Sequence, residues 1–352
     1  MPYCRKCGTE LDETAWFCSA CGTPVAVAAP VTKQTAPERR PIHVLPVAIL
    51  IAVLVSAGVI GALLVLPVSP VHFNQTNPVP EAGMDDLFFD LQVDVAQVNI
   101  VFKDLPSNVL MLNVTADGSV GIFEDPDQTV SVTFTYQATN NSIVVIANVS
   151  LVAQWSIFND LNVKCDVYID PSADLTLQVR SSVGNIHLVA DSEVTLESLR
   201  LEATTGNIDV SLSEDAVVAG YVSLRTTTGT VWFEMDEADV SRDISVNLQS
   251  TTGGVNVDLA ASRMLSGNVT VNARATTGSV NLDMAIDGNV GARIESTANL
   301  GGITSDVKRF SGNESPIQSN NYPAGSNFLV DLRTETGGIN INAVYGSSSI
   351  LN

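Results

Sequence analysis

The chain has 352 residues and a formal net charge of −21, because Asp and Glu outnumber Lys and Arg by 38 to 17. This length allows two or more domains. Nucleic acid is excluded as an expected partner, since phosphate binding needs concentrated Lys and Arg. Hydrophobic residues make up 45% of the chain and charged residues only 16%, which excludes a disordered acidic tail.

The first 25 residues contain two short cysteine motifs. Cys4 and Cys7 form one CxxC pair, Cys18 and Cys21 form another, and a glycine follows each pair. Two thiolates from each motif can converge on one tetrahedral zinc ion. Because all four ligand positions are then filled by protein, the spacing predicts structural zinc. A segment this small cannot fold on its own apolar surface, so the metal would supply the folding free energy. Two disulfides are the alternative, and they would suit a secreted chain.

Residues 3–25 closely resemble the short zinc ribbon at the N-terminus of many prokaryotic membrane proteins. The matching residues include Phe17-Cys18 and Cys21-Gly-Thr-Pro24. The resemblance implies a zinc-bound fold for this segment. It implies little about function, since such ribbons serve many proteins.

A hydrophobic segment divides the chain. Residues 26–42 have the composition of a linker, and residues 43–67 predict a membrane-spanning helix whose uncharged run extends from Val44 to Leu66. A signal peptide is the alternative, but the run is too long and a folded motif precedes it. Lys33, Arg39 and Arg40 precede the span, so the positive-inside rule predicts a single-pass protein with a cytoplasmic N-terminus and an extracellular C-terminal region. A cytoplasmic location also argues against the disulfide alternative.

The region that follows the span is expected to have two parts. Residues 68–86 contain Pro70, Pro78 and Pro80 and predict a short extended tether. Residues 87–170 contain several strand-like runs without the glycine corner described next. We expect them to cap the N-terminal end of the repeats, as the terminal units of repeat proteins must.

Residues 171–346 contain a corner motif, most often Thr-Thr-Gly, that recurs seven times. The glycines are Gly184, Gly206, Gly229, Gly253, Gly278, Gly301 and Gly337. The first five intervals are 22 to 25 residues and the last is longer. A fixed period of this size indicates one supersecondary unit stacked on itself.

Alternating polarity surrounds each corner. The second residue after the glycine is always apolar: Ile186, Ile208, Val231, Val255, Val280, Ile303 and Ile339. The residues between the apolar positions are mostly polar, which is the period of a strand with one buried face. Each repeat therefore reads as a strand, a tight glycine corner and a second strand. The fold class that follows is all-β, an extracellular β-solenoid of about seven coils.

The outer region resembles the family known as DUF4097, or toastrack-type candidate adhesins. The matching stretches are Val167-Tyr-Ile-Asp-Pro, its continuation to Gly184-Asn-Ile, and the later Thr-Thr-Gly-x-Val/Ile units. The resemblance covers about residues 165–345. It implies an envelope-facing membrane protein and carries no shared catalytic residues.

The sequence gives little support for catalysis. His187 lies at a polar strand position, and Cys165, the only cysteine after the membrane span, reads as a buried and inert thiol. No P-loop, HExxH motif or Ser/His/Asp order is present. We therefore expect no enzymatic activity.

Two further features have alternative readings. Four aspartates recur near the second strand of the repeats: Asp209, Asp258, Asp283 and Asp306. They could hold calcium, but the sequence signature of calcium-filled β-rolls is missing, so solvated carboxylates are favoured. A column of threonines could bind glycans or ordered water, while the simpler reading is that they suit a strand edge: Thr205, Thr228, Thr252, Thr277 and Thr336. The Phe310–Asn327 insertion is expected to be a projecting loop, either functional or disordered.

Two functions follow from this organisation. The first is a membrane-anchored surface module that binds envelope glycans or surface proteins, with a structural zinc ribbon inside the cell. The alternative is a single-pass signalling or scaffolding protein that couples the outer domain to a cytosolic partner through the ribbon.

Overall fold

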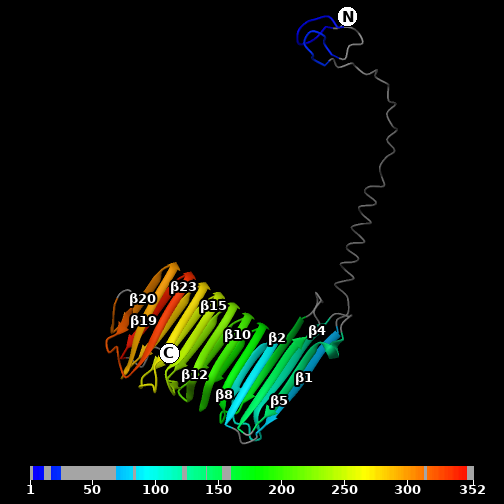
Figure 1. The fold of residues 1–352 in the computed structure, drawn as a ribbon. Helices are drawn as coiled ribbons and strands as arrows, with labels where there is room; N and C mark the ends of the chain where they lie inside the picture. The colour runs from blue at the N-terminus through cyan, green and yellow to red at the C-terminus, as the bar shows by residue number, and fades with distance from the viewer. Residues whose placement is uncertain are drawn as a thin grey trace. The chain divides into compact units, whose positions relative to one another are not determined.

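The computed structural model describes residues 3–11, 17–24, 69–81, 85–120, 125–139, 141–152, 160–312 and 315–346. The chain divides into two compact units, Met1–Val65 and Leu66–Asn352. The described residues form strands, isolated bridges and one 3-10 helix, η1 (Pro126–Gln128), so the all-β prediction is confirmed (Figure 1). Among them, no helix is long and apolar enough to cross a membrane. The predicted linker (26–42) and membrane helix (43–67) lie outside the described residues.

The strands of the second unit form two sheets. The eleven-stranded sheet contains, in spatial order, β1 (Ser69–Pro80), β4 (Asn108–Val120), β7 (Asp160–Ile169), β3 (Gln97–Phe102), β9 (Ile186–Ala190), β11 (Ile208–Leu212), β13 (Val231–Asp236), β16 (Val255–Ala261), β18 (Val280–Ile286), β24 (Ile339–Tyr345) and β20 (Ile303–Lys308). The thirteen-stranded sheet contains β21 (Phe310–Ser311), β22 (Ile317–Ser319), β19 (Val290–Leu300), β23 (Ser326–Thr336), β17 (Val269–Thr277), β15 (Ile244–Thr252), β12 (Ala216–Thr228), β10 (Val194–Thr205), β8 (Asp174–Val183), β2 (Asp86–Val95), β6 (Ser142–Leu151) and β5 (Val130–Ala138), with β14 (Asp239–Val240) beside β12.

Each repeat contributes one strand to each sheet, and we call such a pair a layer. Neighbouring layers pair in parallel with equivalent residues in register, as Val231 with Val255 and Val255 with Val280. The inward-facing side chains of both sheets form one hydrophobic cluster. The predicted alternation of buried and outward-facing residues is therefore present in the strands. Ile303 is an exception, because β20 is an edge strand and leaves that side chain 47% exposed.

Steric packing explains why each corner of the repeats is a glycine. All seven have φ between +135° and +151°, a conformation that strongly favours glycine. The glycines also stack closely, since a Cβ atom on Gly253 would overlap the carbonyl group of Gly229 in the preceding layer. The N–H of Gly229 donates to the carbonyl oxygen of Thr252 at 2.9 Å, which holds one corner on the next. Any side chain at these positions would separate the layers.

The order of the layers differs from the order of the repeats at the C-terminal end. The seventh repeat, β23 and β24, lies between the fifth repeat, β17 and β18, and the sixth, β19 and β20. The layers are therefore not stacked in chain order at this end. The longer interval between Gly301 and Gly337 gives the chain the length to return from the sixth layer and form the seventh repeat between the fifth and sixth layers.

Residues 87–170 are more than the expected cap. β2 and β3 form a complete layer between β6/β7 and β8/β9, and all of these strands pair in parallel. The corner of this layer is at Ala96, whose carbonyl oxygen lies under Gly184. Ala96 is not among the described non-glycine residues with positive φ, so this corner needs no glycine and the layer escapes the sequence pattern. Antiparallel strands β1, β4 and β5 close this end.

The expected tether at 68–86 is wrong over most of its length. Residues Ser69–Pro80 form β1, which pairs antiparallel with β4 along its whole length. β1 is an edge strand, and prolines are tolerated there because the outer N–H groups need no partner. Val71 and Val79 are buried against the core.

The described part of the Phe310–Asn327 insertion contains two short strands joined to the sheet, so the expectation of a projecting loop is wrong for these residues. β21 pairs with β22, and β22 adds antiparallel to the edge of β19. The buried hydroxyl of Ser319 accepts the N–H of Ala292 at 2.9 Å. The insertion therefore covers the β19 edge of the terminal layer, while β20 stays an edge strand among the described residues.

Candidate metal centre and polar faces

The two cysteine motifs form matching turns. The N–H of Gly8 donates to the carbonyl of Cys4, and the N–H of Gly22 donates to that of Cys18, both at 2.8 Å. The two glycines have φ of +73° and +69°, which explains why a glycine follows each pair. Each turn presents its two thiols toward the other motif.

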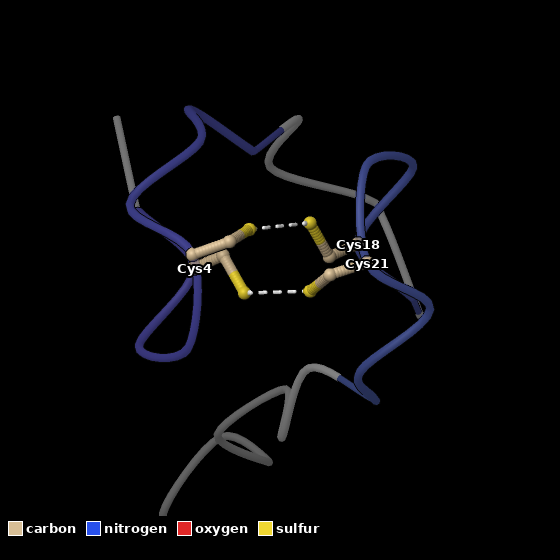
Figure 2. Close-up of side chains that lie close together, drawn as sticks. Cys4, Cys18 and Cys21 are labelled. Atoms are coloured by element: carbon tan, nitrogen blue, oxygen red, sulfur yellow. Dashed lines mark hydrogen bonds between the residues drawn. The ribbon is translucent and has the colours of Figure 1, made fainter.

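The structure brings together the four predicted ligands, Cys4, Cys7, Cys18 and Cys21. Their sulfur atoms all lie within 4.8 Å of one another. The Cys4–Cys21 and Cys7–Cys18 sulfur pairs are 3.6 Å and 3.5 Å apart, shown as dashed lines in Figure 2. Zn–S bonds of about 2.3 Å in a tetrahedron require sulfurs about 3.8 Å apart. The cluster therefore has the size and donor set of a zinc site.

Local hydrogen bonds favour the thiolate form that binds metal at Cys4 and Cys7, whereas burial and the neighbouring thiols raise the pKa of Cys18 to about 11. Contacts from the hydroxyl and then the backbone of Thr9 lower the pKa of Cys7 to about 6. Backbone hydrogen bonds from Lys6 and Cys7 lower the pKa of Cys4. The Thr23 hydroxyl stands 3.1 Å from the Cys21 sulfur, in the position that Thr9 takes beside Cys7.

Cys165 belongs to the second unit and is not one of the four clustered cysteines. It lies on β7 with no exposed surface, and burial followed by the charge of Asp166 raises its thiol pKa to about 12. A thiol in this state is neutral and unreactive at physiological pH. The prediction of a buried cysteine is confirmed.

The outer face of the eleven-stranded sheet carries ladders of polar side chains. The amide of Asn281 donates to Asn256, and the amide of Asn340 donates to Asn281, each at 2.7 Å. In the next column Asp258 lies in register between Glu234 and Asp283. Burial, then Asp283 and Glu234, raise the pKa of Asp258 to about 6. Asp258 is thus less solvated than the sequence reading expected.

His187 occupies the predicted surface position. Its Nδ1 lies 3.2 Å from a carboxylate oxygen of Asp209 on the neighbouring strand, and both side chains are about half exposed. An exposed cross-strand pair of this kind is weak in energy. Among the residues that the structure describes, Asp209 is the partner found for the His187 side chain, and no Ser, Thr or Cys side chain is hydrogen-bonded to it.

The predicted threonine column is continuous on the thirteen-stranded sheet. Pairing in register places Thr205 beside Thr228, then Thr252, Thr277 and Thr336, and all five are exposed. Within the described residues their hydroxyls have no side-chain hydrogen bond, so the expectation that they bond their own turn is not met. Buried hydroxyls two positions earlier bond to the corner of the neighbouring layer, as Thr226 donates to the carbonyl oxygen of Gly206 at 2.8 Å.

Sequence reasoning missed a second column on this sheet. Arg225, Gln249, Arg274 and Arg333 stand side by side, four positions before the glycine in each repeat. The alignment of the repeats on their glycines could have revealed it, because the same offset gives Arg180 as well.

Residues 3–25 match the zinc-ribbon domain family. No curated protein matches the chain. The solved structures that are similar to it include three candidate adhesion proteins. A candidate cell adhesion protein from Clostridium sporogenes has 12% identity and a TM-score of 0.41, covering 77% of this chain and 99% of that one. A candidate adhesin from Bacteroides fragilis has 11% identity and a TM-score of 0.32, covering 77% and 96%. A candidate adhesin from Parabacteroides merdae has 10% identity and a TM-score of 0.23, covering 77% and 95%.

Proposed function

We propose that this protein is a membrane-anchored surface module that presents a β-solenoid outside the cell for binding or adhesion. Its N-terminal ribbon, held by zinc at Cys4, Cys7, Cys18 and Cys21, lies in the cytoplasm. The anchor and its orientation rest on the uncharged run from Val44 to Leu66 and on the cations that precede it.

The observation that carries the binding role is the threonine column. It is a row of exposed hydroxyls on adjacent strands, in register over five layers. Strands in a sheet are about 4.8 Å apart, so the row is a regular and rigid array of hydrogen-bonding groups. Such an array is preorganised, which reduces the entropy cost of binding an extended ligand. Substrate turnover is not expected from it.

The role of the zinc ion in the ribbon is structural. Bound to four thiolates it has no open position, so it would stabilise the fold of this segment without taking part in a reaction. The buried sulfur atoms of Cys4 and Cys18 and the matching turns fit that role.

One observation favours the alternative, a coupling of the outer domain to a cytosolic partner. The residues that precede Cys4 and Cys18 are aromatic, and both are exposed, Tyr3 by 63% and Phe17 by 62%. Aromatic side chains are enriched in protein interfaces. Capture of one specific cytosolic protein by wild-type ribbon, lost in Tyr3→Ala/Phe17→Ala, would favour this second function.

Two measurements test the main proposal. Protease added to intact cells should remove the region after Pro70 and leave an N-terminal tag intact. The full-length protein should retain components of the native cell envelope, and Thr228→Val/Thr252→Val should retain less. An N-terminal tag cleaved from outside, or no retention of any envelope component, would contradict it.

A further inference from the structure

The two sheets differ in how they distribute positive charge. Six arginines lie on the described strands of the thirteen-stranded sheet: Arg180, Arg200, Arg225, Arg274, Arg293 and Arg333. The described strands of the eleven-stranded sheet have none. In a chain with a net charge of −21, this concentrates guanidinium groups on one face.

Most of these arginines are already neutralised. Arg200 contacts Glu202 at 2.6 Å, Arg293 contacts Glu295 at 2.6 Å, and Arg333 contacts Asp331 at 2.7 Å. Arg180 lies 3.6 Å from carboxylate oxygens on both Asp90 and Glu202. Four of the six thus have a carboxylate partner within the sheet.

Arg225 and Arg274 are different. Both are exposed, and neither makes an ion pair or a side-chain hydrogen bond with any residue that the structure describes. They stand on β12 and β17, with Gln249 of β15 in register between them. Two strand spacings separate them, which is about 10 Å.

A groove of about 370 Å³ runs between these two arginines. Its outward-facing side chains are Ser223, Arg225, Asn247, Gln249, Asn272 and Arg274, while Leu224 and Leu248 point into the core. No carboxylate lines it. The Asn272 amide donates to Asn247 at 3.1 Å, and Asn247 donates to Ser245 at 3.2 Å, so the amides are held in fixed orientations.

We propose that this groove binds a carboxylate-bearing polysaccharide, with Arg225 and Arg274 each pairing with a carboxylate and the amides binding the hydroxyls between. The inference deepens the proposed surface-binding function and rests on it. An extended polysaccharide places acidic groups at intervals of one or two sugar rings, which suits two guanidinium groups about two strands apart. Tyr221, two residues before Ser223 on β12 and 49% exposed, offers a ring against which a sugar can pack.

The side chains favour a glycan over a protein. The central part of a protein interface is mostly apolar, whereas every outward-facing side chain that lines this groove is polar or charged. Four amide or hydroxyl side chains beside two cations suit a ligand that combines hydroxyls with carboxylates. A second copy of this chain would offer acidic columns such as Glu234 and Asp258, and the experiment includes that outcome.

The test is binding of oligogalacturonate to the full-length protein in detergent, measured by calorimetry. We expect Arg225→Gln/Arg274→Gln to weaken binding at least tenfold. Arg293→Gln removes an arginine that is already paired on the same sheet, so it should change the affinity less than twofold. The methyl ester of the same oligosaccharide should bind at least tenfold more weakly, and added salt should weaken binding of the acid.

Further variants separate charge from shape. Arg225→Lys/Arg274→Lys keeps both charges but loses the planar fork, and should bind with intermediate affinity. Asn272→Ala should weaken binding severalfold. Circular dichroism spectra should match the wild type for every variant, because all of these side chains face outward.

Four results would overturn the inference: no binding of oligogalacturonate, equal binding of its methyl ester, unchanged binding by the Arg225→Gln/Arg274→Gln variant, or tighter binding of poly-glutamate. Self-association that this variant abolishes would assign the groove to a second copy and also overturn it. If oligogalacturonate fails while the full-length protein still retains envelope components, the glycan assignment fails and the surface-binding function stands. Loss of both would remove the function as well.

Discussion

The hydroxyl of Ser250 donates a 2.8 Å hydrogen bond to the carbonyl oxygen of Gly229, one layer earlier in the stack. Ser250 is fully buried, so this bond satisfies a carbonyl that the sharp corner removes from the strand ladder. Thr334 does the same for Gly278 at 3.0 Å. The corners are thus held by side chains as well as by the glycine backbone.

Removing that hydroxyl should have a modest cost. We expect Ser250→Ala to lower the free energy of unfolding by about 1 kcal/mol, because it leaves a buried acceptor without its donor. Urea unfolding followed by circular dichroism measures the change. Thr251→Ala, at the exposed neighbouring position, is the control and should change stability by less than about 0.5 kcal/mol. Equal effects would show that the hydrogen bond contributes nothing.

Gly253 and Gly254 form a matched pair for testing the corner. A Cβ atom at Gly253 would overlap the Gly229 carbonyl, and the φ of +135° is strained for any other residue, so Gly253→Ala should cost more than about 3 kcal/mol. At Gly254 the nearest atom is the Ser279 oxygen at 3.4 Å. Gly254→Ala should therefore change the urea midpoint little. A mild effect at Gly253 would mean that the layers can separate without loss.

The burial of alternate residues predicts a contrast between Val255 and Asn256. Val255 has no exposed surface, so Val255→Asp would bury an unpaired charge and cost several kcal/mol. Asn256 accepts a hydrogen bond from Asn281, which a carboxylate can also accept. Asn256→Asp should cost within about 0.5 kcal/mol in the same unfolding assay. Similar losses at both positions would contradict the strand assignment.

Asp258 should make stability depend on pH. Its folded pKa of about 6 lies above the usual unfolded value, so the folded protein holds the proton more tightly. This contribution is fully present below about pH 4 and is lost as the pH rises through about 6. Because the side chain is only half buried, we expect a loss of about 1 kcal/mol. Thermal unfolding between pH 4 and 7 measures it.

Two variants decide whether that slope belongs to Asp258. Asp258→Asn should reduce the pH dependence and stabilise the protein at pH 7. Asp306→Asn, in the same column on exposed edge strand β20, should leave it in place. If Asp258→Asn keeps the slope, the cause lies elsewhere.

Zinc should be bound with one ion per chain. Cys7→Ser should remove it, because a hydroxyl is a much poorer ligand than a thiolate, and the N-terminal segment should then become sensitive to protease. Elemental analysis of the reduced protein gives the metal content. Cys165→Ser, at a buried site outside the cluster, should retain the zinc. Wild-type protein without zinc would reject the assignment.

Local regularities were readable from the sequence. The corner glycines, the buried positions such as Val231 and Val255, and the threonine column follow from a period that repeats in one dimension. Equivalent residues of stacked repeats must lie side by side, so aligning the repeats is equivalent to pairing the strands. The four cysteines were likewise predictable, because two short loops of fixed spacing can meet at only one tetrahedral ion.

The order of the layers and the closure of the ends depended on tertiary packing. Nothing local requires the repeat of Gly337 to lie between those of Gly278 and Gly301, since parallel pairing is equally good with either neighbour. The layer that turns at Ala96 has no glycine, and Pro70 and Pro78 in β1 suggested a tether where an edge strand forms. In each case a segment of the chain pairs with an exposed strand edge of one of the two sheets. Such an edge exists only once the sheets are assembled, so a local sequence pattern cannot predict the pairing.

The charged neighbours of individual side chains also depend on the tertiary structure. The sequence by itself determined that polar residues such as Arg225, Arg274 and Asp258 face outward, because the strand period fixes the face on which each residue lies. Only the tertiary structure decided that Arg333 forms an ion pair with Asp331 while Arg225 and Arg274 form none with the described residues, and that Asp258 lies between two other acids. Electrostatic energy depends on distances between layers and on burial, and neither exists in a single repeat.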